Sequence, residues 1–184
     1  MTTALVVIDL QEAMRAECEP DNPWANPDAP QVAGRVLAAF RAAGLPVVHV
    51  HHAANHPDDG FHPGNPLSRA MAEVAPLPGE RVVVKRGSSA FIGTGLEEML
   101  RTAGHDALVI LGGEANMCVE STTRMAGNLG FKTRVVADAL VNFQRTRRDG
   151  VVVSPQDVLE MTLANLSGFA RIVDSAEVLA DLGG

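Results

Sequence analysis

Six short runs of aliphatic and β-branched residues recur along the chain, and polar or amphipathic segments separate them. These runs occupy residues 4–8, 47–51, 81–84, 107–111, 133–137 and 170–173. Such nearly uninterrupted hydrophobicity is typical of parallel strands that are buried on both faces. Because helical patterns lie between most of the runs, the chain is expected to form a parallel sheet with right-handed crossovers.

Glycines mark where the intervening helices end. Helices are expected at residues 31–43, 95–103 and 117–129, and each is followed by a glycine. Another helix is predicted to begin after Ser154, an N-cap residue followed by Pro155 in the first turn, and to run to about Ser167. No internal repeat is evident, so the pattern predicts one α/β domain.

Two long irregular segments, residues 17–30 and 52–78, are rich in Pro, Asn, Asp and Gly. Loops of this length in a compact domain are usually functional or mobile. Trp24 lies in the first segment and Phe61 in the second. Each ring either packs its own loop against the domain or forms a wall of a substrate pocket or a subunit interface.

Three of the predicted strands lead to residues that can carry chemistry. The first strand runs into Asp9, the third into Lys85, and the fourth passes through Gly112 and Gly113 towards Cys118. The carboxyl ends of parallel strands face the ligand-binding crevice of an open sheet, so these side chains can converge. Taken singly, Asp9 also suits a helix cap, Lys85 a solvated strand end, and Cys118 a small buried hydrophobic residue.

With these residues in view, the chain resembles the isochorismatase-like cysteine hydrolase superfamily, which includes nicotinamidases and related amidases. The matching motifs follow the expected order through nearly the whole chain: Asp9 and Gln11; Lys85, then Ser89-Ala90-Phe91 and Gly93-Thr94; Asn116-Met117-Cys118-Val119-Glu120 with Thr122 and Arg124; Gly130-Phe131; and Val136-Ala137-Asp138-Ala139. The resemblance implies a catalytic triad of Asp9, Lys85 and Cys118. Pattern and resemblance together predict a single-domain, three-layer, Rossmann-like α/β fold over residues 1–184, with a mostly parallel six-stranded sheet and helices on both faces.

The resemblance implies acyl transfer through a covalent thioester. Asp9 would take the thiol proton, Lys85 and a helix N-terminus would favour the thiolate, and Cys118 would attack an amide, carbamoyl or ureido carbonyl. The backbone N–H groups of Ala115 and Cys118 would stabilise the oxyanion. In the family this site usually depends on a cis peptide bond just upstream, near Gly113-Glu114, whose presence the sequence leaves open. Many family members carry a threonine where this chain has Ala115, so the floor of the pocket is altered.

Four residues near the expected nucleophile are candidates for substrate binding: Gln11, Phe91, Glu114 and Asn116. Gln11 would orient Asp9 or the substrate, or make a structural hydrogen bond. The family pattern places Phe91 beside the active site. Glu114, if it pointed inward, would disfavour an anionic substrate, which favours a cationic or neutral amide. Asn116 would supply a side-chain amide suited to a ureido or carbamoyl substrate.

Five of the six histidines are concentrated in one region: His49, His51, His52, His56 and His62. Nicotinamidases bind zinc there through an Asp and two His, but this chain has no convincing copy of the Asp-x-His pattern. The histidines are therefore expected in ordinary strand and loop positions, and neither a metal nor another cofactor is predicted. The missing metal motif also weakens nicotinamide as a substrate.

Composition agrees with a small enzyme that acts on a small molecule. The chain has 184 residues, of which 46% are hydrophobic, enough for one substantial core. The net charge of -7 argues against a nucleic-acid or anionic-membrane partner, and the cluster Arg145, Arg147, Arg148 is expected on a solvated loop. No leader or membrane span is recognisable, so a cytoplasmic location with reduced thiols is expected. The resemblance implies a homodimer or homotetramer.

Three other functions compete with amide hydrolysis. One is vinyl-ether hydrolysis of the isochorismatase type. Another is a non-catalytic member of the fold, in which Cys118 is only a packed or redox-sensitive thiol. A dinucleotide-binding module is disfavoured, because Gly112-Gly113-Glu114 lacks the G-x-G-x-x-G spacing that brings a pyrophosphate against the backbone.

Overall fold

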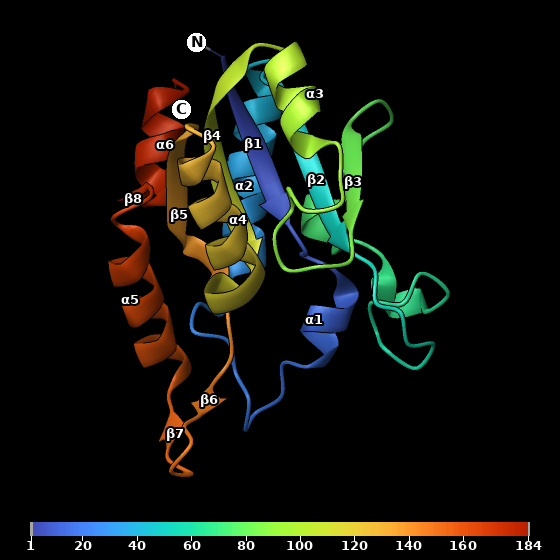
Figure 1. The fold of residues 1–184 in the computed structure, drawn as a ribbon, viewed down its shortest axis with the longest axis vertical. Coiled ribbons are helices and arrows are strands. Elements are labelled where there is room, and N and C mark those ends of the chain that lie inside the picture. The colour runs from blue at the N-terminus through green and yellow to red at the C-terminus, as the bar shows by residue number, and fades with distance from the viewer. Residues whose placement is uncertain (1, 184) are drawn as a thin grey trace.

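Six parallel strands form the central sheet, in the order β3-β2-β1-β4-β5-β8 (Figure 1). The strands span Thr2–Ile8 (β1), Val47–His52 (β2), Arg81–Lys85 (β3), His105–Gly113 (β4), Lys132–Val141 (β5) and Arg171–Val173 (β8). The structure is a computed structural model that describes residues 2–183. Numbered along the chain, the six strands lie in the order 3-2-1-4-5-6, which is the Rossmann arrangement. The predicted fold class is confirmed, and every strand pair of the central sheet is parallel.

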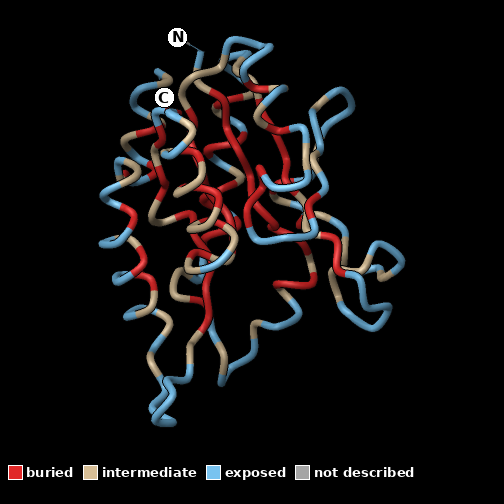
Figure 2. The backbone as a smooth tube through the Cα atoms, viewed as in Figure 1, coloured by how far each residue is buried: buried red, intermediate tan, exposed pale blue. Residues whose placement is uncertain are grey.

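Helices cover both faces of the sheet (Figure 1). They are α2 (Ala29–Ala42) and α6 (Ser175–Asp181) on one face, and α3 (Leu96–Thr102), α4 (Glu120–Asn128) and α5 (Pro155–Leu166) on the other. Leu5 and Val7 of β1 join the core on the α2 face, whereas Val6 and Ile8 join the opposite core. Both faces of β1 are therefore buried, as Figure 2 shows for the centre of the sheet, and this explains its continuous hydrophobic pattern. Within residues 2–183, no helix has the length and apolar character needed to span a membrane.

Several short elements escaped the sequence pattern. They are α1 (Glu12–Ala16), α6, the 3₁₀ turns η1 (Pro66–Ser68) and η2 (Ala72–Val74), and the antiparallel pair β6 (Arg145–Thr146) and β7 (Val152–Val153). Elements of a few residues contain too few periods for a hydrophobic repeat to be recognised. Strand β5 also continues past the predicted end at residue 137 to Val141. The six main strands and four main helices lie where the pattern placed them, apart from the start of α4.

A charged cluster joins α2 to β2 and to the segment before β3. Glu80 accepts hydrogen bonds from Arg41 Nε at 2.7 Å, from Arg41 Nη2 at 2.8 Å and from His49 Nε2 at 2.8 Å. Its carboxylate also accepts from the backbone N–H of Leu77 at 2.8 Å. The hydrogen bonds from Arg41 lower the pKa of Glu80 to about 2, despite partial burial. This cluster uses His49 as a structural residue, outside any catalytic group.

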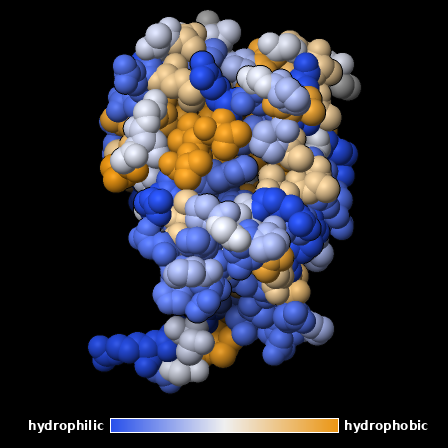
Figure 3. Space-filling model, turned by 90° about the vertical axis from the view of Figure 1, so that its right-hand side faces the viewer, coloured by the Kyte–Doolittle hydropathy of each residue, from blue (hydrophilic) through white to orange (hydrophobic). Residues whose placement is uncertain are grey.

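Strand β3 forms one edge of the sheet and carries exposed hydrophobic side chains. Val82 is 45% exposed and Val84 57% exposed, and Ile92 in the following loop is 57% exposed. Figure 3 faces this edge and shows hydrophobic residues gathered over it. The expectation that this protein forms a homodimer or homotetramer stays a prediction.

Replacing Glu80 with Gln is expected to lower the free energy of unfolding at neutral pH by about 1 to 3 kcal/mol, because Arg41 and His49 lose their charged acceptor. The pKa of Glu80 in the folded protein, about 2, lies below its ordinary value of 4.5. Its contribution is therefore complete above pH 4.5 and is lost as the pH falls towards 2. Urea unfolding across this range measures the difference between the two proteins.

Glu97→Gln is the matched control, because it breaks an exposed ion pair with Arg101. It is expected to change stability by less than about 0.5 kcal/mol. A difference between native protein and Glu80→Gln that stayed constant down to the lowest pH would contradict the assigned role of the carboxylate.

Candidate active site

The carboxyl ends of three strands bring the predicted triad together. Asp9 directly follows β1, Lys85 is the last residue of β3, and Cys118 follows β4. Lys85 Nζ lies 2.6 Å from Asp9 Oδ2 and donates a hydrogen bond to Cys118 Sγ at 3.2 Å. Strands β1 and β4 are neighbours, although β2 and β3 precede β4 in sequence, so the group lies at the switch point where open α/β sheets bind ligands.

The ammonium of Lys85 is held in a buried position. Its side chain is 0% exposed and that of Asp9 is 2% exposed. Besides Asp9 and Cys118, Nζ donates to the backbone carbonyl of Gly87 at 3.2 Å. A buried charge is tolerated when it is paired and its remaining protons find acceptors, and these three contacts meet that requirement.

Burial also sets the protonation states of the group. It raises the pKa of Asp9 to about 6, although the Lys85 cation opposes the shift. Burial, and then the negative charge of Asp9, raise the pKa of Cys118 to about 11. At neutral pH the resting site therefore contains a carboxylate beside a neutral thiol. The expectation that the thiolate is already favoured is wrong for the resting site, because desolvation and Asp9 outweigh the Lys85 cation.

Cys118 lies in a π-helical turn, η3 (Ala115–Val119), and α4 begins only at Glu120. The helix predicted over residues 117–129 therefore begins with a π-helical turn, and its α-helical part starts three residues later than expected. The N–H group of Val119 donates to the carbonyl oxygen of Glu114, five residues earlier, at 3.1 Å, which widens the turn, and the N–H group of Met117 donates to the same oxygen at 3.2 Å. Single π turns are frequent at functional sites.

The backbone before this turn depends on glycine. Gly112 has φ of +126°, and a Cβ on it would lie 2.0 Å from the carbonyl oxygen of Ile8. Only glycine lets β4 approach β1 this closely at the site. The peptide bond Gly113-Glu114 is cis, a point that the sequence had left open. The oxyanion role of the Ala115 and Cys118 N–H groups stays a prediction.

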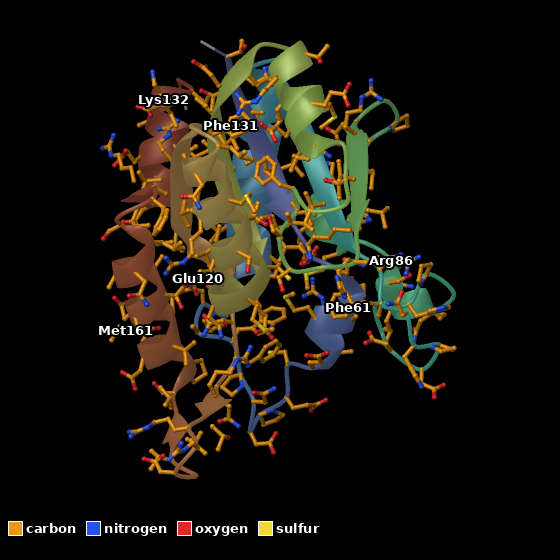
Figure 4. All side chains as sticks on the ribbon, in the orientation of Figure 1. Phe61, Arg86, Glu120, Phe131, Lys132 and Met161 are labelled. Carbon is orange, nitrogen blue, oxygen red and sulfur yellow. The ribbon has the colours of Figure 1, made fainter. Side chains whose placement is uncertain are left out.

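A cavity of about 460 Å³ opens above Cys118. Its lining residues are Asp9, Met14, Glu17, His52, Asp59, Gly60, Phe61, Glu114, Met117 and Cys118. Phe61 comes from the long loop after β2, and Figure 4 shows its ring beside α1. Of the predicted substrate-binding residues, Phe61 and Glu114 line the cavity. Gln11, Trp24, Phe91 and Asn116 do not.

Gln11 has a structural role. Its Oε1 accepts the backbone N–H of His52 at 2.8 Å, and its Nε2 donates to the carbonyl oxygens of His52 at 3.1 Å and Ser68 at 2.7 Å. With both ends of the amide occupied, Gln11 orients the end of β2 instead of the substrate or Asp9. Of the two readings left open by the sequence, the geometry favours the structural hydrogen bond.

The two other aromatic candidates belong to the core. Trp24 is 7% exposed and packs in the core on the α2 face, with the Arg15 guanidinium 6.0 Å from its ring. Phe91 is 9% exposed and stacks on Phe131 at 5.7 Å between ring centroids. Each ring packs its own loop against the sheet, because burial in the core removes the large apolar surface of the ring from water. The side chain of Asn116 is half-buried. Its Oδ1 atom is buried and has no hydrogen-bond partner in residues 2–183.

Glu114 at the cavity wall forms an ion pair with Arg145 of β6. Arg145 Nη2 also lies 3.5 Å from Met117 Sδ. The expectation that the whole arginine cluster lies on a solvated loop is wrong for Arg145, which is half-buried, whereas Arg147 and Arg148 are exposed. Because Arg145 compensates its charge, Glu114 alone gives no reason to exclude an anionic substrate.

Six lining residues were absent from the sequence-based set: Met14, Glu17, His52, Asp59, Gly60 and Met117. Met14 and Glu17 come from α1 and the segment after it, and Asp59 and Gly60 from the long loop after β2. Loop composition indicated that these segments were functional candidates. It did not show which side chains face Cys118, because that depends on how the two loops meet.

The histidines of residues 49–62 do not form a metal-binding group. Within the described residues, no three His, Cys, Asp or Glu side chains come together in a way that could hold a metal ion. His49 is bound to Glu80, His52 lines the cavity, and His56 is exposed on the loop. The expectation of a metal-free site stays a prediction.

Three comparisons with known proteins agree with this geometry. The Isochorismatase domain model matches residues 3–163 of the chain. The crystal structure of an isochorismatase-family protein from Chromobacterium violaceum superposes with a TM-score of 0.94 at 41% identity, covering 99% of this chain and 94% of that one. An uncharacterized isochorismatase-family protein from Bacillus subtilis is 31% identical over 182 residues, which are 97% of this chain and 95% of that protein. Maleamate amidohydrolase from Pseudomonas putida is 30% identical over 192 residues, covering 90% of this chain and 88% of the relative.

Replacing Asp9 with Asn is expected to lower the pKa of Cys118 from its value of about 11, by roughly one unit or more, because the Lys85 cation is then unopposed. The measurement is a pH titration of the ultraviolet absorbance of the thiolate. The double variant Asp9→Asn, Cys118→Ser supplies the signal of Cys18 for subtraction. An unchanged midpoint for Cys118 would show that Asp9 does not control the thiol.

Proposed function

The chain belongs to the isochorismatase family, and from this membership and the geometry of the site we propose that it is a cysteine hydrolase that cleaves a C–N bond of a small amide, carbamoyl or ureido compound. The observation that carries the proposal is the bridge made by Lys85 Nζ, 2.6 Å from Asp9 Oδ2 and 3.2 Å from Cys118 Sγ, at the floor of a cavity of about 460 Å³. The family is one of hydrolases, and one relative is named as an amidohydrolase.

The first half of the reaction forms a thioester. As Cys118 Sγ attacks the substrate carbonyl carbon, the thiol proton moves to the Asp9 carboxylate, and the Lys85 ammonium stabilises the developing negative charge on sulfur. The backbone N–H groups of Ala115 and Cys118 stabilise the oxyanion. The tetrahedral intermediate then breaks its C–N bond, and the proton on Asp9 passes to the departing amine.

The second half returns the site to its resting state. Asp9, again a carboxylate, takes a proton from a water molecule as the water oxygen attacks the thioester carbonyl. The C–S bond breaks, the carboxylic acid product leaves, and the proton on Asp9 returns to the Cys118 sulfur. One carboxylate thus serves as base and acid in both halves.

The cavity wall favours a neutral or cationic substrate. Glu17 and Asp59 add two carboxylates to the lining, and burial together with the negative charge of Asp59 raises the pKa of Glu17. The Glu114 carboxylate is paired with Arg145 and contributes no net charge. The carboxylates of Glu17 and Asp59 therefore give the cavity a negative electrostatic potential, which disfavours an anionic substrate.

Replacing Cys118 with Ala is expected to reduce amide hydrolysis by roughly a thousandfold or more, because the thioester can no longer form. The measurement is ammonia release from a panel of primary amides and ureido compounds, with the native protein and the variant at equal concentration and confirmed folding. Cys18→Ala is the control, because Cys18 lies outside the cavity lining, and it should retain activity. Ammonia release that survived in Cys118→Ala would exclude the thioester mechanism. Hydrolysis of isochorismate without ammonia release from the panel would instead establish the vinyl-ether alternative.

The pH dependence of kcat/KM is expected to report the ionisation of Asp9. The pKa of Asp9 is raised to about 6, and the base must be a carboxylate to accept the thiol proton. The kcat/KM value should therefore rise about tenfold per pH unit below the pKa of Asp9, about 6, and level off above neutrality. A profile that instead rose with a midpoint near the pKa of Cys118, about 11, would mean that a preformed thiolate reacts without help from Asp9.

A further inference from the structure

The hydrogen-bonding groups of the cavity are unbalanced. Four of its lining side chains are carboxylates, which only accept hydrogen bonds when ionised: Asp9, Glu17, Asp59 and Glu114. Two are methionines and one is a phenylalanine, which offer no donor. Within the lining formed by the described residues, His52 is therefore the only side chain other than the Cys118 thiol that can donate a hydrogen bond to a bound molecule.

His52 is held firmly at the cavity wall. It is the last residue of β2 and lies in register with Lys85 of β3. The Gln11 amide clamps its backbone from both sides, at 2.8 Å to the N–H and 3.1 Å to the carbonyl oxygen. Its ring packs edge to face against Phe61, with 5.6 Å between centroids and 74° between planes. A group fixed by these contacts loses little freedom when a ligand binds.

The surroundings of the ring select one tautomer. Burial, and then the Lys85 cation, lower the pKa of His52, so the imidazole is neutral at pH 7. Nδ1 is buried with no hydrogen-bond partner in residues 2–183. A proton there would leave a buried N–H group without an acceptor, which is costly. The proton therefore belongs on Nε2, the ring nitrogen that is not enclosed in this way.

We propose that the Nε2–H group of His52 is the substrate-recognition donor of this cavity, and that it selects amides carrying a second oxygen that can only accept a hydrogen bond, such as a keto or ether oxygen, near the scissile carbonyl. The inference rests on the proposed function and goes beyond it by assigning a specificity residue and a substrate feature. The four acceptor carboxylates cannot bind such an oxygen, and the Cys118 thiol is occupied by the reaction. Gln11 acts through His52 as a positioning residue.

The test compares substrates that differ in one group. Methoxyacetamide and butanamide differ only by an ether oxygen in place of a methylene group, and kcat/KM for each gives a selectivity ratio. In His52→Leu this ratio is expected to fall about tenfold, because the donor is lost. His52→Gln, whose side chain can donate, should recover part of it. His56→Leu is the matched control, because the His56 side chain is 74% exposed on the loop that follows His52, and it should leave the ratio unchanged. The intrinsic reactivities of the two amides cancel in the comparison between proteins.

Two results would overturn the inference. An equal loss of kcat/KM for both amides in His52→Leu would show a merely structural role. Nitrogen–proton NMR correlation spectra of the His52 imidazole in Cys118→Ala give a readout independent of hydrolysis, and a proton found on Nδ1 would exclude the donor. If the native protein hydrolyses no amide, the proposed function fails, and the NMR result still decides the assignment of His52.

Discussion

The buried ion pair between Asp9 and Lys85 is the interaction on which the rest of the site depends. Neither charge is stable away from water without the other, so the two strand ends must meet. Strands β1 and β3 are separated by β2, a distance of about 10 Å across the sheet, which an aspartate alone cannot cover. A lysine at the end of β3 has the length to cross this gap beneath the cavity. The order of the strands therefore requires a long cationic side chain such as lysine at the end of β3.

The same pair governs the sulfur chemistry of the proposed reaction. With burial and Asp9 raising the pKa of Cys118, the resting thiol is neutral, and its proton moves only as a bond to carbon forms. The transfer converts a carboxylate and a thiol into a carboxylic acid and a thiolate, so the net charge enclosed with Lys85 stays constant. A site of this kind avoids keeping a permanently reactive thiolate, which oxidants and unrelated electrophiles would consume.

The walls of the cavity come from segments that are distant in the chain. The segment after α1 supplies Glu17, the loop after β2 supplies Asp59 and Phe61, and the β6 segment supplies the partner of Glu114. Gln11 ties two of these regions together through the backbone of His52 and the carbonyl oxygen of Ser68. The rigid sheet thus positions the reacting groups, while loops held to it by a few hydrogen bonds shape the space above them.

The hydrophobic pattern was sufficient to predict the sheet and the main helices, because strands buried on both faces must be continuously hydrophobic. Strand ends at the same edge of a parallel sheet lie close together, so the pattern also indicated that Asp9, Lys85 and Cys118 can converge, whereas their assignment as a triad came from the resemblance to the family. Which candidate side chains reach the cavity became clear from the folded chain alone. Trp24 and Phe91 fill the core, and Gln11 braces the backbone. His52 and Arg145 reach the site, although their local pattern did not show where their side chains lie. The physical reason is that side-chain placement in long loops, and pKa shifts caused by burial, depend on contacts between residues far apart in sequence.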